Sequence, residues 1–344
     1  MLIDRLYLDH AATTPILPEA QAAVADAMRF WANPSSPHAQ GRAARARLEE
    51  ARARIAAALE WDGAVILTSG ASEAAALALG RTKAGPRFVG ATEHDAVRRA
   101  AGAAASLPVS RLGAVDMSAV AGERPLVAIQ SVNSETGVIQ SPSPPGLWLA
   151  DCAQSAGKLP LPDADLIIVS AHKLGGPPGI GALLVRDLAL LEASGGQEQG
   201  YRGGTENLPG ALGFAAALEA PRDWLEDAAR WRPMLDAAII DAGGEVIAAS
   251  APRLATIASY RMPGMTSAAQ LIRFDLAGIA VSAGSACSSG SLRASPVLAA
   301  MGYDEQAAGE VVRVSFGWTT SEADVARFAA EWGKIARSAR RSAA

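Results

Sequence analysis

This 344-residue sequence has few cysteines, no excess of basic over acidic residues and no long apolar runs. Each of these absences excludes a class of protein. Two cysteines, Cys152 and Cys287, are too few for a disulfide framework, and they lack the C-x-x-C spacing of a zinc or dithiol site. We therefore expect free thiols, no metal and a cytoplasmic location. The formal net charge of −4 argues against nucleic acid as a partner. The apolar runs fall short of the ~20 residues that span a membrane, and the first residues lack the basic-then-apolar pattern of a secretory signal.

The sequence contains enough apolar residues to form a complete hydrophobic core. Hydrophobic residues make up 50% of the chain and charged residues 19%, which excludes an extended disordered chain. Short apolar runs alternate with helical stretches, and this alternation predicts an α/β fold with a mainly parallel central sheet and helices on both faces. We expect strands near residues 64–68, 86–91, 126–132, 147–150, 166–170 and 181–185, and helices at 18–31, 41–60, from about 72, near 95–106, and at 207–219 and 222–240.

The last third of the sequence predicts a smaller α+β domain. Strands are expected near 245–248, 254–260 and 311–316, with a final helix from about 322 to 337. The length suggests about two domains. We place a large domain at residues 14–235 and a small domain at residues 1–13 and 236–344.

Polar residues with chemical capability follow the expected strands. Lys173 comes just after the apolar run 166–170, and functional residues gather at the carboxyl ends of strands in open α/β sheets. Near an apolar interior the pKa of a lysine falls, as an amine needs for Schiff-base formation with a carbonyl. A lone lysine there is more often a surface residue on a turn, so the argument depends on its neighbours.

Three other strand ends carry such neighbours. Asp151 follows run 147–150, where it either forms a turn or faces a pyridine nitrogen. The turn Ser69-Gly70-Ala71-Ser72 opens a helix, which makes it an N-cap, an anion site or both. His94 follows run 86–91, although a lone histidine is more often structural. Each signal is weak alone.

The two cysteines have opposite surroundings. Cys287 stands in the Gly/Ser-rich stretch Gly284-Ser285-Ala286-Cys287-Ser288, which favours the exposure and mobility of a reactive nucleophile. Cys152 follows a strand directly, and we expect it to be buried and inert.

Taken together and in this order, these pieces resemble the cysteine desulfurases, which are pyridoxal-phosphate enzymes of the class V aminotransferase group. The resemblance covers nearly the whole chain. It includes the stretches Leu8-Asp9-His10-Ala11-Ala12-Thr13-Thr14-Pro15, Asn33-Pro34-Ser35-Ser36-Pro37-His38, Glu135-Thr136-Gly137, Arg202-Gly203-Gly204-Thr205-Glu206-Asn207 and Ser285-Ala286-Cys287. The cysteine stretch resembles the group with a long cysteine loop.

The resemblance implies fold type I of the pyridoxal-phosphate-dependent transferases and a role for each matching residue. Lys173 would hold pyridoxal 5'-phosphate covalently and move the substrate proton, Cys287 would accept the sulfur as a persulfide, and His94 would stack on the ring and assist proton transfer. The other cofactor-binding residues would be Ala71, Ser72, Ser134, Asp151, Gln154, Ser170 and His172, with Thr205 from a second subunit. Arg313, with Ser134, would bind the carboxylate of L-cysteine, as a bidentate guanidinium can. The implied partners are a second copy of the chain and a sulfur-acceptor protein, either an iron–sulfur scaffold or a thiolation relay.

Two residues and one segment depart from the family pattern. Ser134 replaces an asparagine that contacts cofactor or substrate, and Trp318 replaces an arginine. Only residues 140–146 stand where the family has a full helix, so we expect an extended crossing and a less covered sheet.

Two alternatives stay open. One is a selenocysteine lyase or another class V pyridoxal-phosphate enzyme. The other is a non-catalytic docking protein for sulfur relay, although such a protein has no need of Lys173, Asp151, His94 and Cys287.

Overall fold

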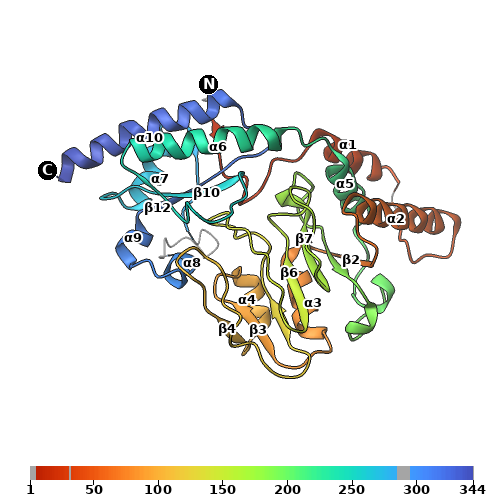
Figure 1. Cartoon of the computed structure of the whole chain (residues 1–344). Helices are drawn as coiled ribbons and strands as arrows, with labels where there is room; N and C mark the ends of the chain where they lie inside the picture. The colour runs from red at the N-terminus through yellow and green to blue at the C-terminus, as the bar shows by residue number, and fades with distance from the viewer. Residues whose placement is uncertain (1–4, 31, 285–294, 344) are drawn as a thin grey trace.

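The computed structural model describes residues 5–30, 32–284 and 295–343, and side chains through residue 340 (Figure 1). Cys287 and its neighbours Ser285, Ala286 and Ser288 in the expected cysteine stretch lie outside the described residues.

A seven-stranded sheet forms the centre of the larger part of the molecule. Its strands lie in the order β2 (Ala64–Thr68), β8 (Gly181–Val185), β7 (Leu166–Ser170), β6 (Leu147–Asp151), β5 (Leu126–Ala128), β3 (Arg87–Gly90) and β4 (Ala105–Leu107). β8 runs antiparallel to both of its neighbours, and the other pairs are parallel. The mainly parallel sheet predicted from the sequence is confirmed.

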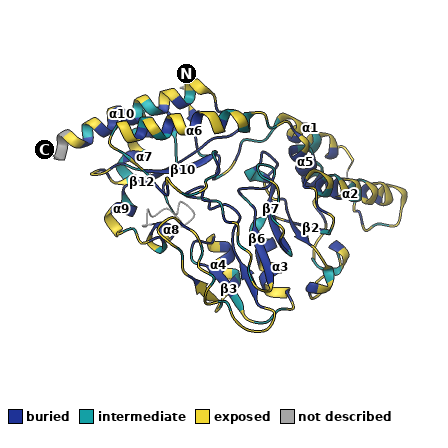
Figure 2. Cartoon of the chain, viewed as in Figure 1, coloured by how far each residue is buried: buried dark blue, intermediate teal, exposed yellow. Residues whose placement is uncertain are grey.

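Helices cover both faces of this sheet because successive strand residues point to opposite sides. Ile167 and Val169 face a core shared with α2 (Ala39–Ala58) and α5 (Leu208–Glu219), beside α1 (Pro18–Ala27). Leu166 and Ile168 face the other core, shared with α3 (Ala71–Arg81) and α4 (Asp95–Ala101). The central strands β5 to β8 are buried, as Figure 2 shows, whereas the helices expose their outer sides. α4 ends earlier than expected because Gly102 takes φ +58° and stops the helix.

The end of the chain builds a second, smaller layer. Strand β10 (Ile257–Arg261) lies between β12 (Val311–Ser315) and β9 (Glu245–Val246), and both pairs are antiparallel. Tyr260, Phe274 and Trp332 pack in a core under the long helices α6 (Trp224–Asp241) and α10 (Glu322–Ala343), which lie side by side in Figure 1. The remaining elements are α7 (Ser267–Leu276), α8 (Pro296–Ala300), α9 (Glu305–Gly309) and the short turns η1 (Ala171–Lys173), η2 (Leu188–Leu190) and η3 (Glu198–Gly200).

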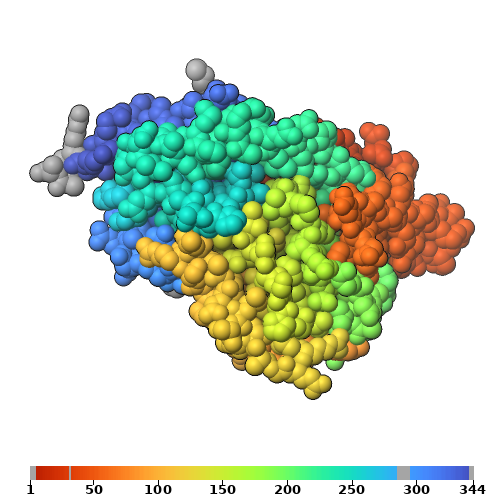
Figure 3. Space-filling model, viewed as in Figure 1, coloured from red at the N-terminus to blue at the C-terminus, as the bar shows by residue number. Residues whose placement is uncertain are grey.

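The start of the chain joins this smaller layer before it enters the larger part. Strand β1 (Leu6–Tyr7) pairs in parallel with β11 (Ile279–Ala280), and Asp9 bridges to Ser315, the last residue of β12. The chain then reaches α1 and α2, which project from one end of the molecule in Figure 3. Residues 8–14 therefore connect the two layers.

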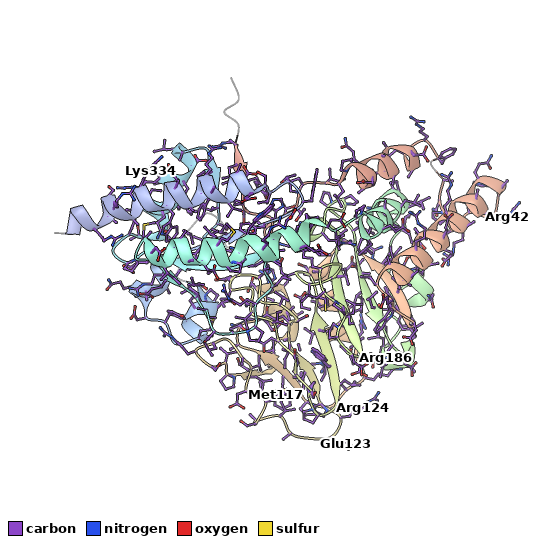
Figure 4. All side chains as sticks on the ribbon, turned by 45° about the horizontal axis from the view of Figure 1, so that its top comes forward. Arg42, Met117, Glu123, Arg124, Arg186 and Lys334 are labelled. Carbon is purple, nitrogen blue, oxygen red and sulfur yellow. The ribbon has the colours of Figure 1, made fainter. Side chains whose placement is uncertain are left out.

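The connection from β5 to β6 contains no helix between residues 129 and 146, as the sequence predicts. The expectation of a less covered sheet is wrong, since Val127, Leu147 and Trp148 are at most 8% exposed. The stretch after β4 covers Val127, because Val115 and Met117 pack in one cluster with it at this edge of the sheet. Met117 is labelled in Figure 4, at the edge of the molecule opposite Lys334 of α10.

Candidate active site

A cavity of about 490 Å³ lies where the carboxyl ends of the central strands meet the smaller layer. This volume falls within the range of small-molecule sites, and the location is typical of open α/β sheets. Apart from Cys287, which lies outside the described residues, the cavity is lined by the residues predicted to act within one chain, which are Ala71, Ser72, His94, Ser134, Asp151, Gln154, Ser170, His172, Lys173 and Arg313. Thr205 is exposed and does not line it.

Lys173 follows β7 at the end of η1, and its side chain turns into the cavity. Nζ donates hydrogen bonds to the carbonyl oxygens of Ala11 and Ala12, both at 2.7 Å. Two backbone acceptors therefore fix the position of the amine, so Lys173 is not the surface lysine of the simpler interpretation.

Asp151 ends β6 on the floor of the cavity. Its Oδ1 accepts the amide of Ala153 at 2.9 Å, and the side chain is buried. Burial raises the pKa of Asp151 above its ordinary value, although the Ala153 amide and the charge of Lys173 act in the opposite direction. A buried carboxyl of this kind gains from a cationic N–H partner, such as a protonated ring nitrogen.

Glu93 is a second buried carboxyl behind this floor. One of its oxygens accepts the amide of Gln130 at 2.7 Å. Burial, and then the charge of Asp151, hold the pKa of Glu93 well above its ordinary value. The two buried carboxyl groups therefore disfavour each other's ionisation, and of the two only Asp151 lines the cavity.

Gln154 and His94 present hydrogen-bonding groups with defined orientation. Gln154 Nε2 donates to Ala11 O at 2.9 Å, while its buried Oε1 has no partner among the described residues. His94 caps α4, and its Nδ1 accepts the amide of Ala96 at 3.1 Å, which assigns the proton to Nε2.

The turn after β2 makes one end of the cavity an anion site. Gly70 takes φ +145°, and α3 begins at Ala71 with its first amides directed at this end. Glu73 holds the turn from behind, because its carboxylate accepts Ser69 N at 2.5 Å and Arg202 Nε at 2.8 Å. His172 also lines this end, and burial, with the charge of Lys173, lowers its pKa to about 4, so the ring is neutral at neutral pH.

Arg313 reaches the cavity from β12 of the smaller layer. Its Nη1 donates to Ser134 O at 3.0 Å and its Nη2 to Asp9 Oδ1 at 2.7 Å. Ser134, the residue that departs from the family pattern, thus contributes its backbone carbonyl to this contact and also lines the cavity.

Sequence reasoning missed the contribution of residues 8–15. The carbonyls of Ala11 and Ala12 orient Lys173 and Gln154, and Trp318 Nε1 donates to Pro15 O at 2.8 Å. The stretch Leu8–Pro15 is part of the resemblance to the family. Its contacts could not be predicted from residue types, because they are made by backbone carbonyls, which every residue has. Trp318 thereby gains a structural role in place of the expected arginine.

The described part of the chain offers neither a membrane-spanning helix nor a metal site. No helix in it is long and apolar enough to cross a membrane. No group of three or more His, Cys, Asp or Glu side chains in it is arranged to hold a metal ion.

Comparison with known proteins agrees with this geometry. The aminotransferase class-V family matches residues 6–328. An IscS-like cysteine desulfurase from Mycobacterium tuberculosis is 36% identical over 365 residues, which cover 93% of each chain. A solved NifS-like protein from Rickettsia africae superposes with a TM-score of 0.84 at 27% identity, covering 96% of this chain and 99% of the other.

A third similar protein has been solved with cysteine bound. The structure described as SspA in complex with cysteine has a TM-score of 0.77 and 26% identity, covering 90% of this chain and 98% of that one. The family match, the identity over nearly the full length and the shared fold type I lead to one assignment. The chain belongs to the aminotransferase class-V family and, within it, to the cysteine desulfurases.

Proposed function

We propose that this chain is a cysteine desulfurase that converts L-cysteine to L-alanine, with the sulfur held as a persulfide on Cys287 and passed to an acceptor protein. The observation that carries the proposal is one cavity in which an oriented lysine amine, a buried carboxylate, a helix N-terminus and an arginine converge.

The residues present fit pyridoxal 5'-phosphate. The amides at the start of α3, with Ser72, Ser170 and His172, would hold the phosphate, and Asp151 would pair with the ring nitrogen. The orphaned Oε1 of Gln154, or its amide after a flip, meets a polar ring substituent. When bound, the cofactor supplies an electron sink for a carbanion at the substrate α-carbon.

The chain's own residues would handle binding and protons. Arg313 would hold the α-carboxylate of L-cysteine and so fix which substrate face meets Lys173. Lys173 Nζ, oriented by the Ala11 and Ala12 carbonyls, would remove the α-proton. His94, with its proton on Nε2, would assist the transfer.

Cys287 would complete the transfer of sulfur. Its thiolate attacks the substrate sulfur, so that a sulfur–sulfur bond forms while the substrate carbon–sulfur bond breaks. The electron pair of the broken bond stays on carbon, where a proton completes the methyl group of alanine. Gly284, three positions before Cys287 in the sequence, lines the cavity.

The wider arrangement is part of the same proposal. We place a large domain at residues 14–235 and a small domain at residues 1–13 and 236–344, in a homodimer in which Thr205 of one subunit completes the phosphate site of the other. An exposed Thr205 outside the cavity of its own chain supports this arrangement. We expect the acceptor to be an iron–sulfur scaffold or a thiolation relay, in the cytoplasm.

Mass spectrometry after incubation with L-cysteine tests the proposal. We expect the peptide that contains Cys287 to gain one sulfur atom and alanine to accumulate. The variant Cys287→Ser should keep the visible absorption of the bound cofactor and release no sulfur. Full sulfur release by this variant would remove Cys287 from the reaction, and a preference for selenocysteine in a parallel assay would favour the lyase alternative.

A further inference from the structure

The described residues place a carboxylate directly behind the arginine of the cavity. Asp9 Oδ1 accepts a hydrogen bond from Arg313 Nη2 at 2.7 Å. The Arg313 side chain is 9% exposed and that of Asp9 is 21% exposed, so water screens this ion pair little. Arg313 lines the cavity and Asp9 does not.

The backbone around Asp9 is itself well anchored. Its carbonyl accepts the Tyr7 hydroxyl at 3.1 Å and the Ala12 amide at 3.0 Å. The Ala11 amide donates to Ser315 Oγ at 2.8 Å, which ties the same segment to β12 two residues beyond Arg313. The carboxylate of Asp9 is therefore held at a fixed place relative to the strand that carries the arginine.

These contacts fix the orientation of the guanidinium group. Asp9 holds Nη2 from one direction and Ser134 O holds Nη1 at 3.0 Å from another, while the buried Nε has no partner among the described residues. Each η nitrogen carries a second hydrogen. An arginine held in this way keeps N–H groups for a carboxylate and does not have to search among its rotamers when substrate enters.

We propose that Asp9 is a positioning residue, which fixes Arg313 for the α-carboxylate of L-cysteine. The inference rests on the substrate role proposed above for Arg313. Asp9 acts through the arginine, because its carboxylate contacts Arg313 and does not face the cavity.

The test compares L-cysteine with cysteamine, which is the same molecule without the carboxylate. Both are titrated into the cofactor-loaded Cys287→Ser protein, in which sulfur transfer is blocked, and binding is followed by the change in visible absorption. We expect Asp9→Ala to weaken L-cysteine binding about tenfold, as loss of one charge-assisted hydrogen bond allows. Cysteamine binding should stay unchanged.

Two further measurements separate positioning from general damage. With Cys287 intact, Asp9→Ala should raise KM for L-cysteine about tenfold and leave kcat within about twofold.

Asp9→Asn keeps an oxygen acceptor for Arg313 without the charge, so its effect on L-cysteine binding should be smaller. This variant carries the test if Asp9→Ala does not fold. Asp275→Ala, which removes the exposed ion pair of Asp275 with Arg5, is the matched control and should change neither ligand.

The outcomes distinguish this inference from the function on which it rests. Equal weakening of cysteamine and L-cysteine in the Asp9 variants would overturn positioning, because the damage would then not depend on the carboxylate. Unchanged L-cysteine binding in Asp9→Ala, with weakened binding in Arg313→Ala, would overturn it as well and leave the role of Arg313 intact. Unchanged binding in Arg313→Ala would overturn the substrate role of Arg313 itself.

Discussion

Trp318 shows how a single departure from the family pattern is accommodated. Its indole N–H donates to Pro15 O at 2.8 Å, and its side chain closes a small space beside Lys173 and Trp224. The variant Trp318→Phe keeps an aromatic ring and removes the donor. We expect it to lower the free energy of unfolding by about 1 kcal/mol, measured by urea denaturation.

Trp224→Phe provides the matched control for this prediction. Trp224 lines the same small space, and no hydrogen bond of its indole occurs within the described residues. An equal loss of stability in both variants would show that ring volume, and not the hydrogen bond to Pro15, is what matters.

His10 makes stability depend on pH. Burial, and then the charge of Lys158, lower the pKa of His10 from 6.5 to about 4. The unfolded chain therefore binds this proton at higher pH than the folded chain does. As the pH falls from 6.5 toward 4, the unfolded state gains the proton first, and folding loses up to about 3 kcal/mol from this residue.

The variant His10→Asn should remove this contribution. Its free energy of unfolding should fall less steeply than that of the wild type between pH 6.5 and 4, as measured by urea titration at several pH values. The prediction fails if His10→Asn keeps the wild-type slope.

Cys152 is a thiol that native protein should not expose to reagents. Its side chain is fully buried, and burial raises its pKa to about 12. We expect iodoacetamide at pH 8 to leave Cys152 unmodified in the folded protein and to modify it in urea, with peptide mass spectrometry as the measurement. Modification in the folded protein would contradict the expectation of an inert cysteine.

Side chains at strand ends could be predicted from the sequence, whereas their supports could not. Asp151, His94 and Lys173 follow buried strands, and parallel strands bring such ends together at one edge of the sheet. The acceptors of Lys173 are backbone carbonyls of two alanines, and the partner of Arg313 lies 304 positions away. No local pattern records either contact, because both depend on how the two layers meet.

At the scale of elements, Gly137 fixes the helix-free crossing between β5 and β6 onto the smaller layer. Its φ is +75°, and a Cβ there would lie 2.3 Å from the carbonyl oxygen of Ile257. This contact explains why glycine ends the Glu-Thr-Gly motif. Gly137→Ala should lower the free energy of unfolding by about 3 kcal/mol, because both the backbone angle and the space exclude a side chain.

Gly80→Ala is the control at this scale. Gly80 lies in α3 with no atom within 4 Å of an added Cβ. Alanine there should leave stability unchanged or raise it by about 0.5–1 kcal/mol. If thermal unfolding showed the two variants to be alike, close approach at Gly137 would not constrain the crossing.

Most elements could be predicted because their apolar runs are short and clearly separated, as in β7 and β8. The segment that covers the edge of the sheet could not be predicted. The sequence shows that a helix is missing after β5, but residues 108–120 cover this edge without regular secondary structure over most of their length. Irregular segments pack through contacts that have no period, so composition does not indicate which surface they will cover.

At the scale of the whole molecule, the cavity lies between two layers that residues 8–14 hold together. The same segment bonds to Ser315 and Arg313 on one side and to Lys173 and Gln154 on the other. Alignment of Arg313 with Lys173 therefore depends on packing between the two layers. A second subunit would add a third component through Thr205.

Mixed dimers test whether Thr205 acts on its own chain or on its partner. In a dimer of one Lys173→Ala chain and one Thr205→Ala chain, an intersubunit role leaves one complete site, made of the Lys173 of the second chain and the Thr205 of the first. We expect such dimers, purified through two different tags, to regain about half of the wild-type alanine production per dimer and one tightly held cofactor. Each variant alone forms no complete site and serves as a control. If Thr205 served its own chain, the mixed dimer would have no complete site and would be as defective as either variant alone. If the protein sedimented as a single chain, a site shared between subunits would be excluded.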